Sequence, residues 1–94
     1  MISLEKAKQY LRVDSDFEDD MILSLLNSAY KMAGDILRLD IKELELLKEN
    51  DDDSIDLAIL YALSYMYENR GTADYNRLLL DLRSLLEPKR KGAF

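Results

Sequence analysis

The chain contains no cysteine and no histidine among its 94 residues. Without cysteine it can form neither disulfides, nor a thiolate nucleophile, nor a cysteine-based zinc site. Without histidine it lacks the commonest metal ligand and the side chain best suited to proton transfer near neutral pH. We therefore expect no catalytic residue, no metal site and no cofactor, and we rank an enzyme behind structural and interaction proteins.

Proline and glycine are also scarce, with one proline and three glycines. Together with abundant Leu, Glu, Lys and Asp, this favours an all-α domain over a sheet with many turns. A chain of this length suits a single domain over residues 1–94 that buries only about 60 to 65% of the surface its unfolded chain exposes. The amino-terminal sequence has no secretory-signal pattern, so we expect synthesis in a cytoplasm.

Charge is unevenly distributed along the chain. Residues 1–56 carry fifteen acidic and seven basic side chains, a net charge of −8, whereas residues 57–94 carry four and six, a net charge of +2. An acidic part and a basic tail on one small molecule suit head-to-tail self-association better than duplex-DNA binding, which needs a concentrated basic surface. A solvated acidic surface that only aids solubility is the simpler alternative.

Capping signals and helical periodicity predict four main helices. Ser3 begins the first, and Ser15-x-x-Glu18 has the form of a capping box for the second. Gly71 and Pro88 end the third and fourth. The predicted ranges are 3–12, 16–38, 54–70 and 74–87, with a further short helix over 41–48 and a flexible basic tail over 88–94.

The third predicted helix is apolar nearly all round. From Leu57 to Tyr67 its only polar residue is Ser64. An ordinary surface helix has one apolar stripe, so a helix of this kind must be covered on both sides. Eleven residues are too short to cross a bilayer, so we expect no membrane and instead a partner subunit as the cover. The stripe facing the domain's own core is predicted to comprise Ile55, Ala58, Ile59, Ala62, Tyr65 and Met66.

Two acidic segments are candidate cation sites. Asp14-x-Asp16-x-Glu18 resembles the start of a calcium loop, yet Asp19 stands where the loop needs glycine and Leu25 where it needs glutamate. Asp51–Asp53 has no accompanying phosphate-binding loop. Helix capping and solvent exposure are the better interpretations of these carboxylates.

Several segments together resemble the small head–tail connector proteins of tailed bacteriophages and prophages. They are the opening Met1–Asp14, the helix from Asp19 to Ala33, the sequence Tyr67-Glu68-Asn69-Arg70-Gly71, and Leu85-Leu86-x-Pro88 followed by Arg90. The resemblance implies a structural, all-helical virion protein that forms a ring of about a dozen copies beneath the portal. Such a ring completes the head, passes duplex DNA, and meets a head–tail stopper or tail-completion protein.

Under this interpretation, Tyr61, Tyr67 and Arg70 are predicted to lie at or near the contact between subunits. Replacing Tyr61 or Tyr67 with glutamate should then impair assembly without loss of helicity. The resemblance also implies that the C-terminal segment reaches toward the portal, which assigns portal docking to the tail residues Lys89, Arg90, Lys91 and Phe94. An acidic lumen would let DNA slide, because negative walls repel phosphate.

Two other classes compete with the connector. A small helical adaptor or regulator would bind a partner helix in a groove flanked by Tyr and Met, and would be a monomer or dimer. A nucleic-acid-binding module would stack bases on Tyr61, Tyr65 and Tyr67, but no basic residue lies between Asp51 and Glu68. Packing in the core or at an interface is the preferred role for these tyrosines.

Overall fold

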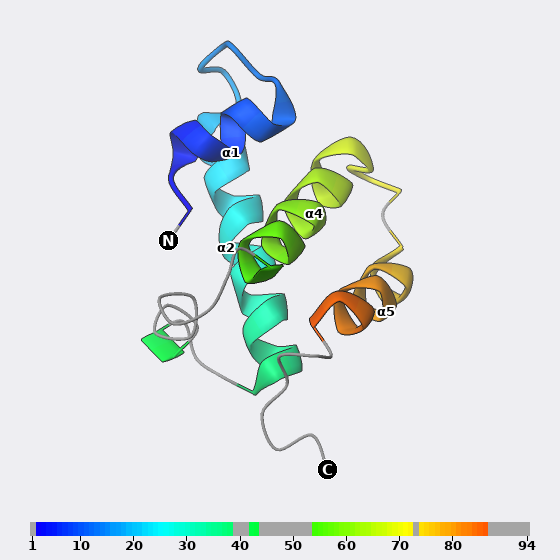
Figure 1. The fold of residues 1–94 in the computed structure, drawn as a ribbon. Coiled ribbons are helices and arrows are strands. Elements are labelled where there is room, and N and C mark those ends of the chain that lie inside the picture. Colours follow the sequence, from blue (N-terminus) through cyan, green and yellow to red (C-terminus); the bar gives the residue numbers. More distant parts are fainter. Residues whose placement is uncertain (1, 39–41, 44–53, 73, 87–94) are drawn as a thin grey trace.

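A computed structural model describes residues 2–38, 42–43, 54–72 and 74–86. Within these ranges the main elements are four helices and no strand: α1 (Leu4–Leu11), α2 (Asp19–Leu37), α4 (Ser54–Glu68) and α5 (Tyr75–Leu86) (Figure 1). The all-α prediction with four main helices is confirmed. Of the predicted helix 41–48 only residues 42 and 43 are described, and both are helical; the tail 88–94 lies outside the described residues.

The ends of α1 follow from local chemistry. The Ser3 side chain accepts a hydrogen bond from the Lys6 amide at 3.1 Å, which satisfies one of the free donors of the first turn. The helix ends at Arg12, which adopts a left-handed conformation with φ of 61°. The N-cap predicted at Ser3 is therefore confirmed.

The start of α2 differs from the prediction. The helix begins at Asp19, three residues later than expected, and its N-cap Glu18 makes no side-chain capping bond. The predicted capping box is wrong because the Glu18 carboxylate instead accepts hydrogen bonds from Tyr67 and Arg70, about fifty positions along the chain. The Glu18 side chain that the capping box would require therefore makes a tertiary contact instead.

The turn between α4 and α5 is built largely as expected. Gly71 has φ of +84°, the left-handed conformation that glycine adopts at low cost. Asp74 then caps α5, since its Oδ1 accepts from the Arg77 amide at 3.1 Å. The Tyr65 hydroxyl accepts a hydrogen bond from the Asp74 amide at 3.0 Å, which ties the end of the turn back to α4.

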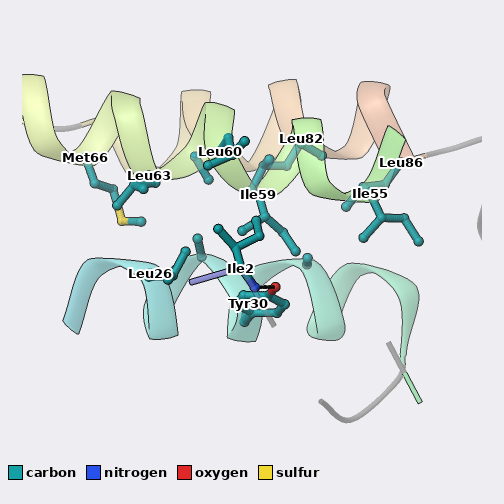
Figure 2. Packing of buried hydrophobic residues seen from close by; sticks show 14 of the residues in the cluster. Ile2, Leu26, Tyr30, Ile55, Ile59, Leu60, Leu63, Met66, Leu82 and Leu86 are labelled. Carbon is teal, nitrogen blue, oxygen red and sulfur yellow. Dashed lines mark hydrogen bonds between the residues drawn. The ribbon is translucent and has the colours of Figure 1, made fainter. Parts of the chain in front are cut away.

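One apolar core holds the helices together. Helix α4 packs against α1, α2 and α5, and Figure 2 shows its Ile59, Leu60 and Leu63 with Leu26 and Tyr30 of α2 and Leu82 of α5. No charged or polar residue other than tyrosine is buried among the described residues. The buried residues of α4 are Ile55, Ala58, Ile59, Leu60, Ala62, Leu63 and Met66.

The cover of α4 corrects the sequence-based expectation. Within the run from Leu57 to Tyr67, Leu57 is the one residue that is mostly exposed, at 59%. Helices α1, α2 and α5 cover the rest in whole or in part, so the prediction that a partner subunit must cover this helix is wrong. The most exposed large apolar side chains in the described ranges lie elsewhere, at Phe17 (96%) and Leu80 (62%).

The amino-terminal residues are held in the core by one long-range hydrogen bond. The Ile2 amide donates to the hydroxyl of Tyr30, a fully buried residue of α2, at 2.7 Å. Ile2 itself is 6% exposed, so the bond satisfies a backbone donor that has little access to water. None of the helices in the described ranges has the length and hydrophobicity needed to cross a bilayer.

Candidate subunit-interface site

The carboxylate of Glu18 joins the turn before α2 to the end of α4. The Tyr67 hydroxyl donates to Glu18 Oε1 at 2.5 Å, and Arg70 Nη1 donates to Glu18 Oε2 at 2.7 Å. Each carboxylate oxygen therefore has its own donor. Hydrogen bonds to an ionised acceptor are stronger than those between neutral groups, so this pair fixes the position of Glu18.

Arg70 makes two further contacts in the same cluster. Its Cζ lies 4.8 Å from the centroid of the Tyr67 ring, within cation–π range. Its Nη1 also lies 3.3 Å from Met21 Sδ on the first turn of α2. The Arg70 side chain remains 48% exposed, so about half of its surface is open to solvent.

A lysine from α1 also contacts this turn. Lys8 Nζ lies 3.0 Å from Asp16 Oδ1 and 2.8 Å from Asp19 Oδ1. The Lys8 side chain is 15% exposed, so its stem packs along the protein while the ammonium group meets both carboxylates. Asp16, Glu18 and Asp19 are all held by cations from other helices or turns.

The proton affinities of these groups reflect their partners. The hydrogen bonds from Tyr67 and then Arg70 lower the pKa of Glu18 below its ordinary value of 4.5. The same contacts with Glu18 raise the pKa of Tyr67 and that of Arg70. Asp19, followed by Asp16, raises the pKa of Lys8. Over a wider pH range, Glu18 thus stays ionised, and Tyr67, Arg70 and Lys8 stay protonated, as their contacts require.

Phe17 lies in the middle of this fixed turn and faces solvent. Its side chain is 96% exposed, and its neighbours Asp16 and Glu18 are the two carboxylates held by Lys8 and by Tyr67 with Arg70. Sequence reasoning did not single out Phe17, because it belongs to no helical stripe. The available signal was a lone aromatic residue within the acidic stretch Asp14–Asp20.

Tyr61 lies in a second cluster that joins α4 to α5. Its hydroxyl donates to Asp81 Oδ2 at 2.7 Å, and this bond raises the pKa of Tyr61. Arg77 Nε lies 3.8 Å from Asp81 Oδ1, one turn away on α5. The hydroxyls of all three α4 tyrosines are thus bonded within the chain, while their rings remain half-buried.

The residues predicted for the subunit contact fall into two groups. Tyr67 and Arg70 lie together on Glu18, and Tyr61 lies apart with Asp81. Their place at a subunit contact stays a prediction, as does portal docking by Lys89, Arg90, Lys91 and Phe94, which lie outside the described residues.

The acidic turn serves to hold backbone segments together. The cations Lys8 and Arg70 already occupy the carboxylates of Asp16, Glu18 and Asp19. In the described part of the chain, no group of three or more acidic side chains is placed to hold a metal ion. The cluster therefore fixes a shape and a charge pattern at the surface.

Acid is expected to release the Glu18 contact. Because the folded pKa of Glu18 lies below 4.5, its contribution to stability is fully present above 4.5 and is lost as the pH falls through the folded value. Denaturant unfolding of the protein and of Glu18→Gln should show a stability difference that is constant near neutral pH and shrinks below 4.5. Asp14→Asn is the matched control, and an unchanged difference in acid would contradict the assignment.

Comparison with known proteins gave a match to a protein-family model. The family model described as phage gp6-like head-tail connector protein matches residues 1–84, which include α1, α2, α4, both clusters and all of α5 except its last two residues. Searches of curated proteins and of solved structures gave no match.

Proposed function

This chain belongs to the family of phage gp6-like head–tail connector proteins, and from that premise we propose that its copies form a ring beneath the portal. In that position the ring completes the DNA-filled head and joins it to the tail. The family is structural, so the protein contributes contacts rather than a reaction. Its other partners are the portal protein on one side and a stopper or tail-completion protein on the other.

The observation that carries this proposal is the extent of the family match. It covers 84 of the 94 residues and includes every residue of the Glu18 cluster and every core residue except Leu86. A match to one helix would support only a shared element. A match across the whole packed unit supports a shared role.

The charge of the chain is compatible with a passage for DNA. Its net charge is −6, and acidic side chains at the described surface include the exposed Asp14, Asp16 and Asp20. A ring with an acidic lumen repels phosphate and lets duplex DNA move without binding. The basic segment Lys89–Lys91, with Phe94, is proposed to dock on the portal instead.

The proposed subunit contact includes Tyr61, Tyr67 and Arg70. Half-buried rings and a guanidinium that is half exposed leave surface that a second copy can cover. Aromatic residues and arginine are enriched at the centres of protein interfaces, which supports this assignment.

Electron microscopy and sedimentation of the purified protein test the proposal. We expect rings at high protein concentration or on addition of purified portal, and loss of portal binding when residues 88–94 are removed. The truncated chain should still form rings, because the four helices remain. A defined monomer or dimer that binds no portal under either condition would overturn the proposal and favour a helical adaptor.

A further inference from the structure

The outer face of α5 carries a hollow with the geometry of a packing site for a side chain. Asn76, Leu79, Leu80 and Arg83 line it, at positions i, i+3, i+4 and i+7 of one helix. Four residues at this spacing form the hole that receives one knob in knobs-into-holes packing. Here Leu79 is 39% exposed and Leu80 is 62% exposed, while Leu78, Leu82 and Leu86 face the core. The hole is open to solvent.

A knob that suits this hole lies elsewhere on the same chain. Phe17 is the most exposed large apolar side chain in the described residues. Its two neighbours along the chain both form ion pairs, Asp16 with Lys8 at 3.0 Å and Glu18 with Arg70 at 2.7 Å. Because these ion pairs already order the turn, covering the ring costs little further conformational entropy in the turn.

The charges around the knob and the hole are complementary. Asp14 and Asp20 flank the Phe17 turn, and neither has an ion-pair partner among the described residues. Arg83 lines the hole and likewise has no ion-pair partner there. Opposite charges on the rims of two surfaces favour their encounter and set their orientation.

The two surfaces cannot meet within one molecule. Figure 1 shows the turn before α2 at the top of the molecule and α5 at the lower right, on the far side of α4. A contact between them must join two copies, and it uses a different surface on each. Such a heterologous contact repeats from copy to copy and closes into a ring when the rotation allows.

We propose that Phe17 of one copy inserts into the α5 hole of the next copy, formed by Asn76, Leu79, Leu80 and Arg83. This inference rests on the proposed function, because it names the surfaces through which the ring assembles. It commits to a second copy of this chain as the partner, for the reasons of shape, preorganisation and charge given above. Truncation of an aromatic anchor of this kind typically weakens binding by about 30-fold.

Disulfide trapping tests the contact directly, since the chain has no cysteine of its own. Phe17→Cys and Leu80→Cys are made as separate variants, one with a tag that changes its mobility. Mixed and treated with a mild thiol oxidant at assembling concentrations, they should give mainly the mixed disulfide dimer. Ser28→Cys, at an exposed position on α2, is the matched control and should give little disulfide with Phe17→Cys.

A second measurement uses Phe17→Ala. We expect its dissociation constant for self-association to rise about 30-fold by analytical ultracentrifugation. At concentrations where both proteins are monomeric, its melting temperature should equal that of the wild type, because the ring is 96% exposed in the single chain. Leu80→Asp should weaken assembly through the other side of the contact.

The outcomes separate this inference from the proposed function. If wild-type rings form but no disulfide joins positions 17 and 80, and Phe17→Ala assembles normally, the contact is wrong and the connector role stands. If Phe17→Ala forms rings but no longer binds portal, Phe17 is a portal anchor and the copy-to-copy contact is overturned. If no wild-type rings form with or without portal, both proposals fail.

Discussion

Replacement of Leu63 by alanine is expected to lower the free energy of unfolding by about 3 kcal/mol. Leu63 is fully buried on α4, within the core that joins this helix to α2 and α5. The change removes apolar contacts from the core and leaves a cavity that close-packed helices fill only in part. Domains of this size are stable by about 5–15 kcal/mol, so the loss is a large share of the total.

Urea unfolding followed by circular dichroism measures this effect. In a separate thermal melt, the melting temperature should fall by roughly 12–24 °C, because each 1 kcal/mol lowers it by about 4–8 °C in a domain of this size. Leu80→Ala is the matched control, since the same atoms are removed from a side chain that is 62% exposed. Its stability should change by less than about 0.5 kcal/mol, while its self-association weakens. Equal losses of stability in the two variants would contradict the description of the core.

Replacement of Tyr30 by phenylalanine is expected to destabilise the fold by about 2 kcal/mol. The Tyr30 hydroxyl accepts a hydrogen bond from the Ile2 amide at 2.7 Å, and both residues are buried. Without the hydroxyl oxygen, the Ile2 amide has no hydrogen-bond acceptor at this position. Because Ile2 is buried, water has little access to replace the lost partner. The cost of an unsatisfied buried donor exceeds the net value of an average hydrogen bond.

Chemical denaturation and amide exchange test this second prediction. Exchange at Ile2 should accelerate in Tyr30→Phe, because the amide has lost its partner. Tyr75→Phe removes the same atom from a side chain that is 50% exposed and should leave stability nearly unchanged. If the exchange rate of the Ile2 amide in Tyr30→Phe equals that in the wild type, this bond does not hold the N-terminal residues.

The helices themselves could be predicted from local patterns. Ser3 and Asp74 cap α1 and α5, and each side chain accepts a hydrogen bond from the backbone amide three residues later. Gly71 follows α4 in the left-handed conformation that glycine adopts at low cost. These interactions involve neighbours in the chain, so spacing alone predicts them. The core stripe of α4 was likewise predicted from periodicity, and all of its members are buried except the half-buried Tyr65.

Prediction was wrong where a distant residue competed with a local motif. Ser15-x-x-Glu18 has the spacing of a capping box, yet Glu18 bonds Tyr67 and Arg70 and α2 begins at Asp19. The apolar excess of α4 was assigned to a partner subunit, although α1, α2 and α5 cover it within one chain. The joint contact of Tyr67 and Arg70 with Glu18 could not be read from their position in the sequence, while their place at a subunit contact stays a prediction.

The sequence by itself determined an all-helical unit, the residues that face its core and its likeness to phage connectors, because these depend on composition, period and order. Only the tertiary structure decided what the apolar run from Leu57 to Tyr67 packs against, since burial depends on which helices approach it. It alone also revealed Phe17 as an exposed ring on a turn held by Lys8 and Arg70. The physical reason is that exposure and ion pairing join residues far apart in the chain, and no local spacing encodes them.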